Sequence, residues 1–177
     1  MNIPITDSAL DVAGWFYKRA KTEGLYLEHE RLQHLLFLSQ SHFALSNKNS
    51  MLMPSLFVCG RDGFFEPTIA KMIANGNNQF PETEFNKQIT LFLEAIWKKY
   101  SNLSLRDLSD LIKSHTSYDK YYISGKKNIV SLQDMITEFK VIHHLNAEKP
   151  IMGKENKKIL ISQNGPVVVS KWQPRKL

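Results

Sequence analysis

The sequence predicts a mainly helical fold: a compact domain of several helices around a buried central helix at about residues 29–46, with a small C-terminal extension that resembles a β-hairpin. Three observations predict this arrangement. Residues 29–46 are apolar on nearly every face, which is typical of a helix surrounded by other elements. The segments on either side repeat apolar residues at helical spacing. Near the C-terminus, two β-branched runs flank Asn164-Gly165.

Each expected helix has a recognisable beginning or end. Gly24 follows the first helix, and Pro67 suits the start of the third, which ends near Asn75-Gly76. Ser104 with Asp107, and Ser131 with Asp134, have the spacing of a capping box. Besides the central helix, the expected helices are 8–22, about 67–74, 83–101, 104–115, and a last one from Ser131 through Met135, Ile136, Phe139 and Ile142.

Two segments lack a helical pattern. Residues 53–67 contain Pro54, Gly60 and Gly63, and they are expected to be irregular or to form short strands. Residues 117–130 are expected only to connect helices, so the body is predicted to be all-α. In the extension 157–172, Pro166 directly follows the turn and limits that strand to an edge.

The net charge of +6 is unevenly distributed. Residues 1–139 contain 15 Lys/Arg and 15 Asp/Glu, whereas residues 140–177 contain 8 Lys/Arg and 2 Asp/Glu. We therefore expect a helical domain of balanced charge at 1–145 and a basic extension at 146–177. No apolar run approaches the roughly 20 residues of a membrane span, and no secretory signal is recognised. A cytoplasmic protein without a membrane partner is expected.

The histidines do not have the spacing of a metal site. His34 and His42 are eight residues apart, and the adjacent His143-His144 pair points to different helix faces. Glu30 lies four residues before His34, which favours a surface or half-buried side-chain contact over a metal. His115 follows a helix end, where it could bond exposed carbonyls. No metal and no cofactor are predicted. Gln40, in the central helix, is expected to be hydrogen-bonded inside the body.

The residues around Cys59 do not indicate an enzyme. Cys59 is the lone cysteine, so it cannot form an intramolecular disulfide. It could pair with a histidine as a nucleophile, but it has no glycine elbow, and a small core residue is the ordinary alternative. The stretch CGRDG (59–63) lacks the Lys-Ser/Thr of a phosphate-binding loop. Arg61-Asp62 is expected to form a turn at a binding edge.

The basic extension offers a different chemistry. Lys157, Lys158 and Trp172 lie among the basic residues of the extension, and such residues with an aromatic ring can bind nucleic acid through phosphate contacts and stacking. Two alternatives stay open: a solvated tail that keeps the protein soluble, or a tail that packs against an acidic protein.

Residues 27–67 resemble the signature of the Panacea antitoxin domain, also called SocA-like, phage-associated or GepA-like. LEHERLQHLLFLSQSHFAL (27–45) matches a Leu-Gln-x-Leu-Leu-aromatic-x-Ala-Gln-Gly helix, with Ser39 and Ser41 at the Ala and Gly positions. GFFEP (63–67) keeps Gly63 and Pro67 of the following turn but has Phe64 where the family usually has proline. The resemblance extends over about residues 8–142, through VAGWFYKRA, LSLRDLSDLIKSHTSYDKYY with His115 at a family His position, and NIVSLQDMITEF.

This resemblance implies a mainly helical antitoxin that neutralises a cognate toxin by direct binding or delivers it to a protease. The toxin would be encoded next to it, and the family supplies no catalytic residues. The alternative is a regulatory protein that contacts nucleic acid through the 150–177 tail; a hydrolase using Cys59 is a third hypothesis. The candidate partner-binding residues are Arg61, Asp62, Phe64, Phe65, Lys157, Lys158 and Trp172.

Overall fold

A computed structural model describes residues 3–115, 118–123, 126–137, 158–162 and 165–169. These residues form a largely helical body with a small sheet, followed by a separate hairpin. The helices are α1 (Ala9–Thr22), α2 (His29–Ser46), α3 (Pro67–Ala74), α4 (Lys87–Tyr100), α5 (Leu105–His115), α6 (Tyr118–Tyr121) and residues 132–137. The strands are β1 (Phe57–Gly60), β2 (Gly63–Phe65), β3 (Ile129–Val130), β4 (Lys158–Ser162) and β5 (Gly165–Val169).

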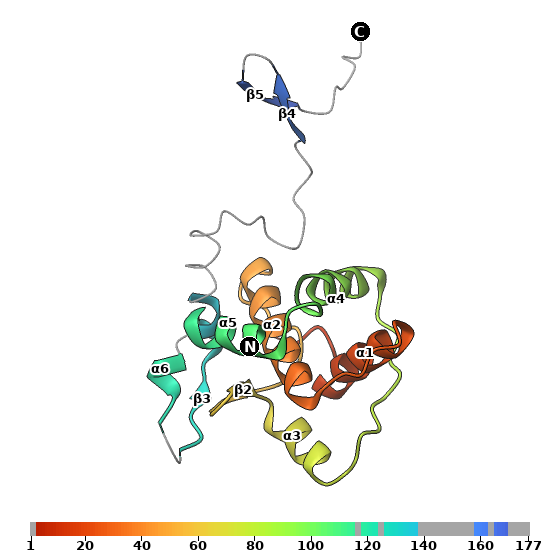
Figure 1. Cartoon of the computed structure of the whole chain (residues 1–177), viewed down its shortest axis with the longest axis vertical. Coiled ribbons are helices and arrows are strands. Elements are labelled where there is room, and N and C mark those ends of the chain that lie inside the picture. Colours follow the sequence, from red (N-terminus) through yellow and green to blue (C-terminus); the bar gives the residue numbers. More distant parts are fainter. Residues whose placement is uncertain (1–2, 116–117, 124–125, 138–157, 163–164, 170–177) are drawn as a thin grey trace.

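Helix α2 is the centre of the body, as predicted. Every residue from Leu32 to Ala44 is buried. The helix packs against α1, α3, α4, α5 and β2, and Figure 1 shows these elements arranged around it. The hydroxyls of Ser39 and Ser41 donate to the carbonyls of Leu35 and Phe37, so these small polar side chains are satisfied within the helix itself.

The expected caps explain most helix boundaries. The Ser104 hydroxyl accepts from the Asp107 amide at 3.1 Å, and Ser131 accepts from the Asp134 amide at 3.1 Å. Gly24 and Gly76 adopt positive φ where α1 and α3 end. Helix α4 begins at Lys87 and not at 83, because the Asn86 side chain accepts from the Ile89 amide and caps the helix there.

The prediction of an all-α body was wrong. Strands β1, β2 and β3 form an antiparallel sheet in the order β2-β1-β3, with Val58 opposite both Phe65 and Ile129. Residues 117–130, expected only to connect helices, contain α6 and β3. Strands of two to four residues are too short to show a period-2 pattern, and β3 pairs with a strand far away in the sequence.

Two glutamines of α2 hold both ends of the segment that contains β1 and β2. Before β1, the amides of Leu52 and Met53 each donate to Gln40 Oε1 at 3.2 Å. After β2, the Glu66 amide donates to Gln33 Oε1 at 2.7 Å. The expectation that Gln40 is hydrogen-bonded inside the body is therefore confirmed. The Gln33 and Gln40 side chains therefore fix the β1–β2 hairpin on the central helix.

The C-terminal hairpin is also present. Strands β4 and β5 pair antiparallel, with Ser162 opposite Gly165 and Pro166 opposite Ile161. The last predicted helix is described over residues 132–137, and its expected continuation through Phe139 and Ile142 lies outside the described residues. None of the helices that the structure describes is both long enough and apolar enough to cross a membrane.

Candidate functional site

A pocket of about 350 Å³ that opens to solvent lies between the β1–β2 turn and α2, and we call it the turn pocket. Two chain segments form its walls. Its lining residues are Glu30, Gln33 and His34 of α2, and Gly60, Arg61, Asp62, Gly63, Phe64 and Phe65 of the hairpin. A cavity of this size lies at the lower end of the range of small-ligand sites.

The backbone of the turn is held by side chains from two other helices. The Ser109 hydroxyl of α5 donates to the Asp62 carbonyl at 2.8 Å. The Tyr118 hydroxyl of α6 lies 2.7 Å from the Arg61 carbonyl and 2.9 Å from the Gly60 carbonyl. Burial raises the pKa of Tyr118 to about 12, so its hydroxyl stays protonated and able to donate. The turn is thus a fixed feature of the surface.

His34 is one of two buried polar residues that line the turn pocket, the other being Gln33. The His34 side chain is 2% exposed, and neither ring nitrogen has a hydrogen-bond partner among the described residues. Gly63, with φ of 134°, lies against the ring, and a Cβ at Gly63 would stand 2.9 Å from His34 Cε1. Glycine is required here because any larger residue would meet the ring and would be strained at that φ.

The charges of the turn pocket follow from burial and neighbouring groups. Burial, followed by the nearby Lys113 ammonium, lowers the pKa of His34 to about 4, so the ring is neutral at pH 7. Burial and the Asp62 carboxylate raise the pKa of Glu30. Glu30 Oε1 lies 3.7 Å from His34 Nε2, and Lys113 Nζ lies 3.9 Å from Asp62 Oδ1. The Glu30–His34 contact expected from the sequence is present, with the ring fully buried.

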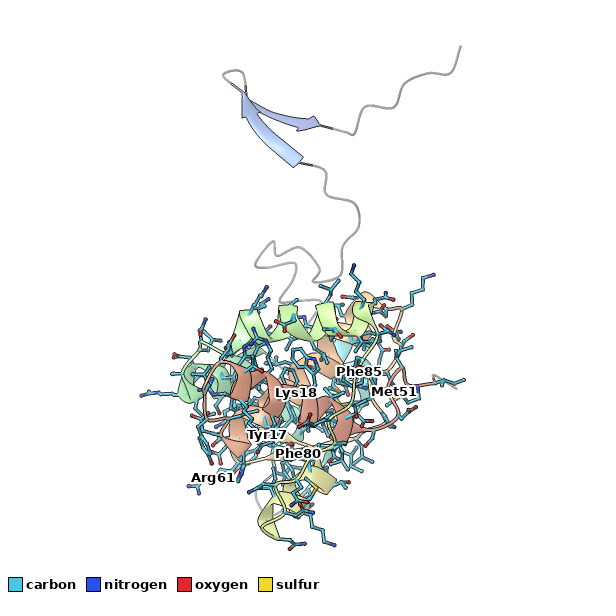
Figure 2. All side chains as sticks on the ribbon, turned by 90° about the vertical axis from the view of Figure 1, so that its right-hand side faces the viewer. Tyr17, Lys18, Met51, Arg61, Phe80 and Phe85 are labelled. Carbon is cyan, nitrogen blue, oxygen red and sulfur yellow. The ribbon has the colours of Figure 1, made fainter. Side chains whose placement is uncertain are left out.

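The structure brings together the candidate residues of the β1–β2 turn. The side chains of Arg61 and Asp62 are exposed, and Figure 2 shows Arg61 extending outward at the edge of the body. Phe64 is 1% exposed and stacks on Phe37 with ring centroids 4.5 Å apart, whereas Phe65 is half-buried. Lys157 and Trp172 lie outside the described residues; Lys158 lies in β4, where only the backbone is described.

Sequence reasoning did not select Glu30, His34 or Gly63 as site residues. The spacing of His34 from other metal ligands disfavours a metal site. It does not predict whether the ring has hydrogen-bond partners in the fold. The only sequence signals available were the i,i+4 pair Glu30/His34 and a glycine that follows a two-residue turn. Glu30 and His34 come close to Gly63 only because the β1–β2 hairpin packs on α2.

The described residues do not assemble a metal site or a reactive thiol. Among them, no three His, Cys, Asp or Glu side chains are placed to hold a metal ion. Cys59 is buried in β1, and burial raises the pKa of its thiol to about 11. A thiol with this pKa stays protonated at neutral pH and is a weak nucleophile.

A second pocket, of about 740 Å³, is lined by α1, by residues 24–27 that follow it, and by the segment before α4. Tyr17 and Phe80 stack there with ring centroids 4.5 Å apart, and Figure 2 shows them on the same face. Lys18 Nζ lies 3.6 Å from Glu82 Oε2 at its edge. The segment packs closely on α1, because a Cβ at Gly14 would stand 2.0 Å from the Pro81 carbonyl oxygen. The sequence did not predict this cavity.

Comparison with known proteins gives no match, whether to a protein-family model, to a curated protein or to a solved structure. The resemblance to the Panacea antitoxin domain therefore stays a hypothesis that rests on the residues given above.

Proposed function

We propose that this chain is an antitoxin-like protein that neutralises a cognate toxin, encoded next to it, by direct binding or by delivering it to a protease. The observation that supports this proposal is the β1–β2 turn. Its backbone carbonyls are held by Ser109 and Tyr118, while the side chains of Arg61 and Asp62 are exposed. A turn that is already ordered loses little conformational entropy on binding, which favours its use in recognition.

Coexpression with each adjacent gene tests the proposal. The chain is expected to rescue growth that the neighbouring product arrests, and to copurify with that product. Exchanging the two turn charges in the double variant Arg61→Glu, Asp62→Lys is expected to abolish both effects. A matched control is the double variant Arg106→Glu, Asp110→Lys, which exchanges an exposed pair on α5 at the same net charge. Absence of rescue and of any complex would refute the proposal.

The protease route has its own readout. If the chain delivers the toxin to a protease, the toxin accumulates and rescue is lost in a host that lacks that protease. If neutralisation is by direct binding, rescue persists there and the stoichiometric complex is recovered.

The second candidate function is contact with nucleic acid through the 150–177 tail. The distribution of charge favours it, because residues 1–139 are neutral and residues 140–177 carry the entire excess of +6. Gel-shift assays across salt concentrations compare the full chain with a variant whose tail Lys and Arg are replaced by Gln. Binding of the full chain is expected to weaken steeply with salt and to be lost in the variant. Equal behaviour of the two proteins would exclude this function.

A further inference from the structure

Two groups at the centre of the turn pocket are held close together without bonding each other. Glu30 Oε1 lies 3.7 Å from His34 Nε2, beyond hydrogen-bond distance. Both ring nitrogens of His34 lack a partner among the described residues, although the side chain is almost fully buried. A buried polar group that has no partner in the protein costs free energy unless another molecule bonds it. A bound molecule that exchanges a hydrogen bond with the ring would remove this cost.

Neighbouring polar side chains do not supply that group. Gln33 also lines the pocket, but its amide is committed to the Glu66 backbone, accepting at 2.7 Å and donating at 3.5 Å. Lys113 faces Asp62 at 3.9 Å. Arg61 extends away from the body in Figure 2. The pocket thus offers an unpaired imidazole beside a carboxylate.

The charge of the pocket selects the occupant. The neutral ring presents one lone pair, and Glu30 and Asp62, which also line the pocket, present carboxylate oxygens. These groups accept hydrogen bonds. An anion would be repelled by both carboxylates, whereas a cation that donates several hydrogen bonds would satisfy them. The Phe65 ring beside them can cover the aliphatic stem of a long cationic side chain.

We propose that the turn pocket binds the cationic end of a lysine or arginine side chain of a partner protein, whose N–H groups donate to His34 Nε2 and Glu30 Oε1 together. One donor nitrogen can lie about 2.9 Å from both atoms, because those two atoms are only 3.7 Å apart. The ring proton is then on Nδ1. This inference deepens the proposed function, on which it rests, by naming the chemistry through which the partner is recognised.

Nuclear magnetic resonance of the full chain, with isotope-labelled histidine, tests the site without any partner protein. The probes are Nα-acetyl-lysine methylamide and Nα-acetyl-arginine methylamide. At least one is expected to shift the His34 Nε2 resonance saturably, toward the value of a nitrogen that accepts a hydrogen bond. Nα-acetyl-norleucine methylamide, which has the stem without the charge, is expected to leave it unchanged.

A pair of variants locates the binding. Glu30→Gln, at a half-exposed position, is expected to lower the affinity for the probe about tenfold, which corresponds to the loss of one charge-assisted hydrogen bond. Asp110→Asn removes an exposed carboxylate of α5 and is expected to leave the affinity unchanged. Absence of a saturable His34 shift, equal binding of the norleucine probe, or unchanged affinity in Glu30→Gln would overturn the proposal.

Three further outcomes separate a site for a free amine, a site for a cationic side chain and the antitoxin function. If putrescine binds and both capped amino acids fail, the pocket is a site for a free amine and the side-chain proposal is wrong. If the capped probes bind as expected but no adjacent gene product is neutralised, the antitoxin function fails while the cation site stands. If rescue occurs without probe binding, the antitoxin function stands and the cation site is wrong.

Discussion

At His34 the folded chain keeps an imidazole ring in a place where its protonation is unfavourable. The ring is covered by Gly63 and lies near Glu30. Burial, together with the Lys113 and Arg31 charges, outweighs the attraction of the Asp62 carboxylate and lowers the pKa of the ring. The folded chain therefore favours the neutral ring over the protonated one. This preference links the stability of the whole chain to pH through one residue.

The free energy of unfolding is expected to fall between pH 6.5 and pH 4 because of His34. Its pKa is lowered from 6.5 to about 4 in the folded chain. Within that window the unfolded chain binds a proton that the folded chain does not, so stability is complete above pH 6.5 and is lost as the pH drops. The loss is on the order of 3 kcal/mol. Urea denaturation at several pH values measures it.

The variant His34→Gln provides the comparison for this measurement. Glu28 and Asp134 also have lowered pKa values, so their contribution to acid destabilisation is common to both proteins. The difference in free energy of unfolding between the parent chain and His34→Gln isolates the effect of His34. This difference should narrow as the pH falls, because only the parent chain loses the stability linked to the neutral ring. Parallel curves would show that the folded ring protonates at an ordinary pH.

At the scale of single elements, α2 acts as the support of the hairpin. Gln40 accepts from two buried backbone amides, those of Leu52 and Met53, at the end of a long irregular connection. Its Nε2 has no partner among the described residues. The Gln40 side chain therefore stabilises the fold through its oxygen. Its unpaired amide nitrogen costs free energy and offsets part of that stabilisation.

Replacing Gln40 by leucine is expected to lower the free energy of unfolding by about 2 kcal/mol. The substitution leaves the amides of Leu52 and Met53 without an acceptor, while it removes one unpaired donor. Chemical denaturation measures the change. The control Gln88→Leu, at an exposed position of α4, should stay within about 0.5 kcal/mol of the parent chain. Equal stability of the two variants would contradict the role given to Gln40.

The sequence predicted the helices well because their signals are local. A cap such as Ser104 and the buried face of α2 act within a few turns, and the structure confirms both. The three-stranded sheet could not be predicted, since β3 pairs with β1 through residues far apart in the sequence, with Phe57 opposite Val130. The same reason explains the site: Arg61 and Asp62 form a recognisable turn, but His34 joins them only through packing.

At the scale of the whole molecule, local stability should be graded outward from α2. This helix is buried from Leu32 to Ala44 and contacts most other elements of the body, whereas α6 is a single short turn. We expect the amides from Leu35 to Ala44 to exchange with solvent only through global unfolding, and those of α6 through smaller openings. Hydrogen exchange measured by mass spectrometry checks this order. Equal exchange of α2 and α6 would contradict it.

The hydrogen bonds of two α2 glutamines have a consequence for how such a protein can evolve. Gln33 and Gln40 hold the two ends of the β1–β2 segment through backbone amides, and backbone amides are present whatever side chains the segment carries. Residues at the tip can therefore drift under selection while the ends stay in place. A lineage could exchange Arg61 and Asp62 for other residues, and thereby change the molecule it recognises, without having to rebuild its core.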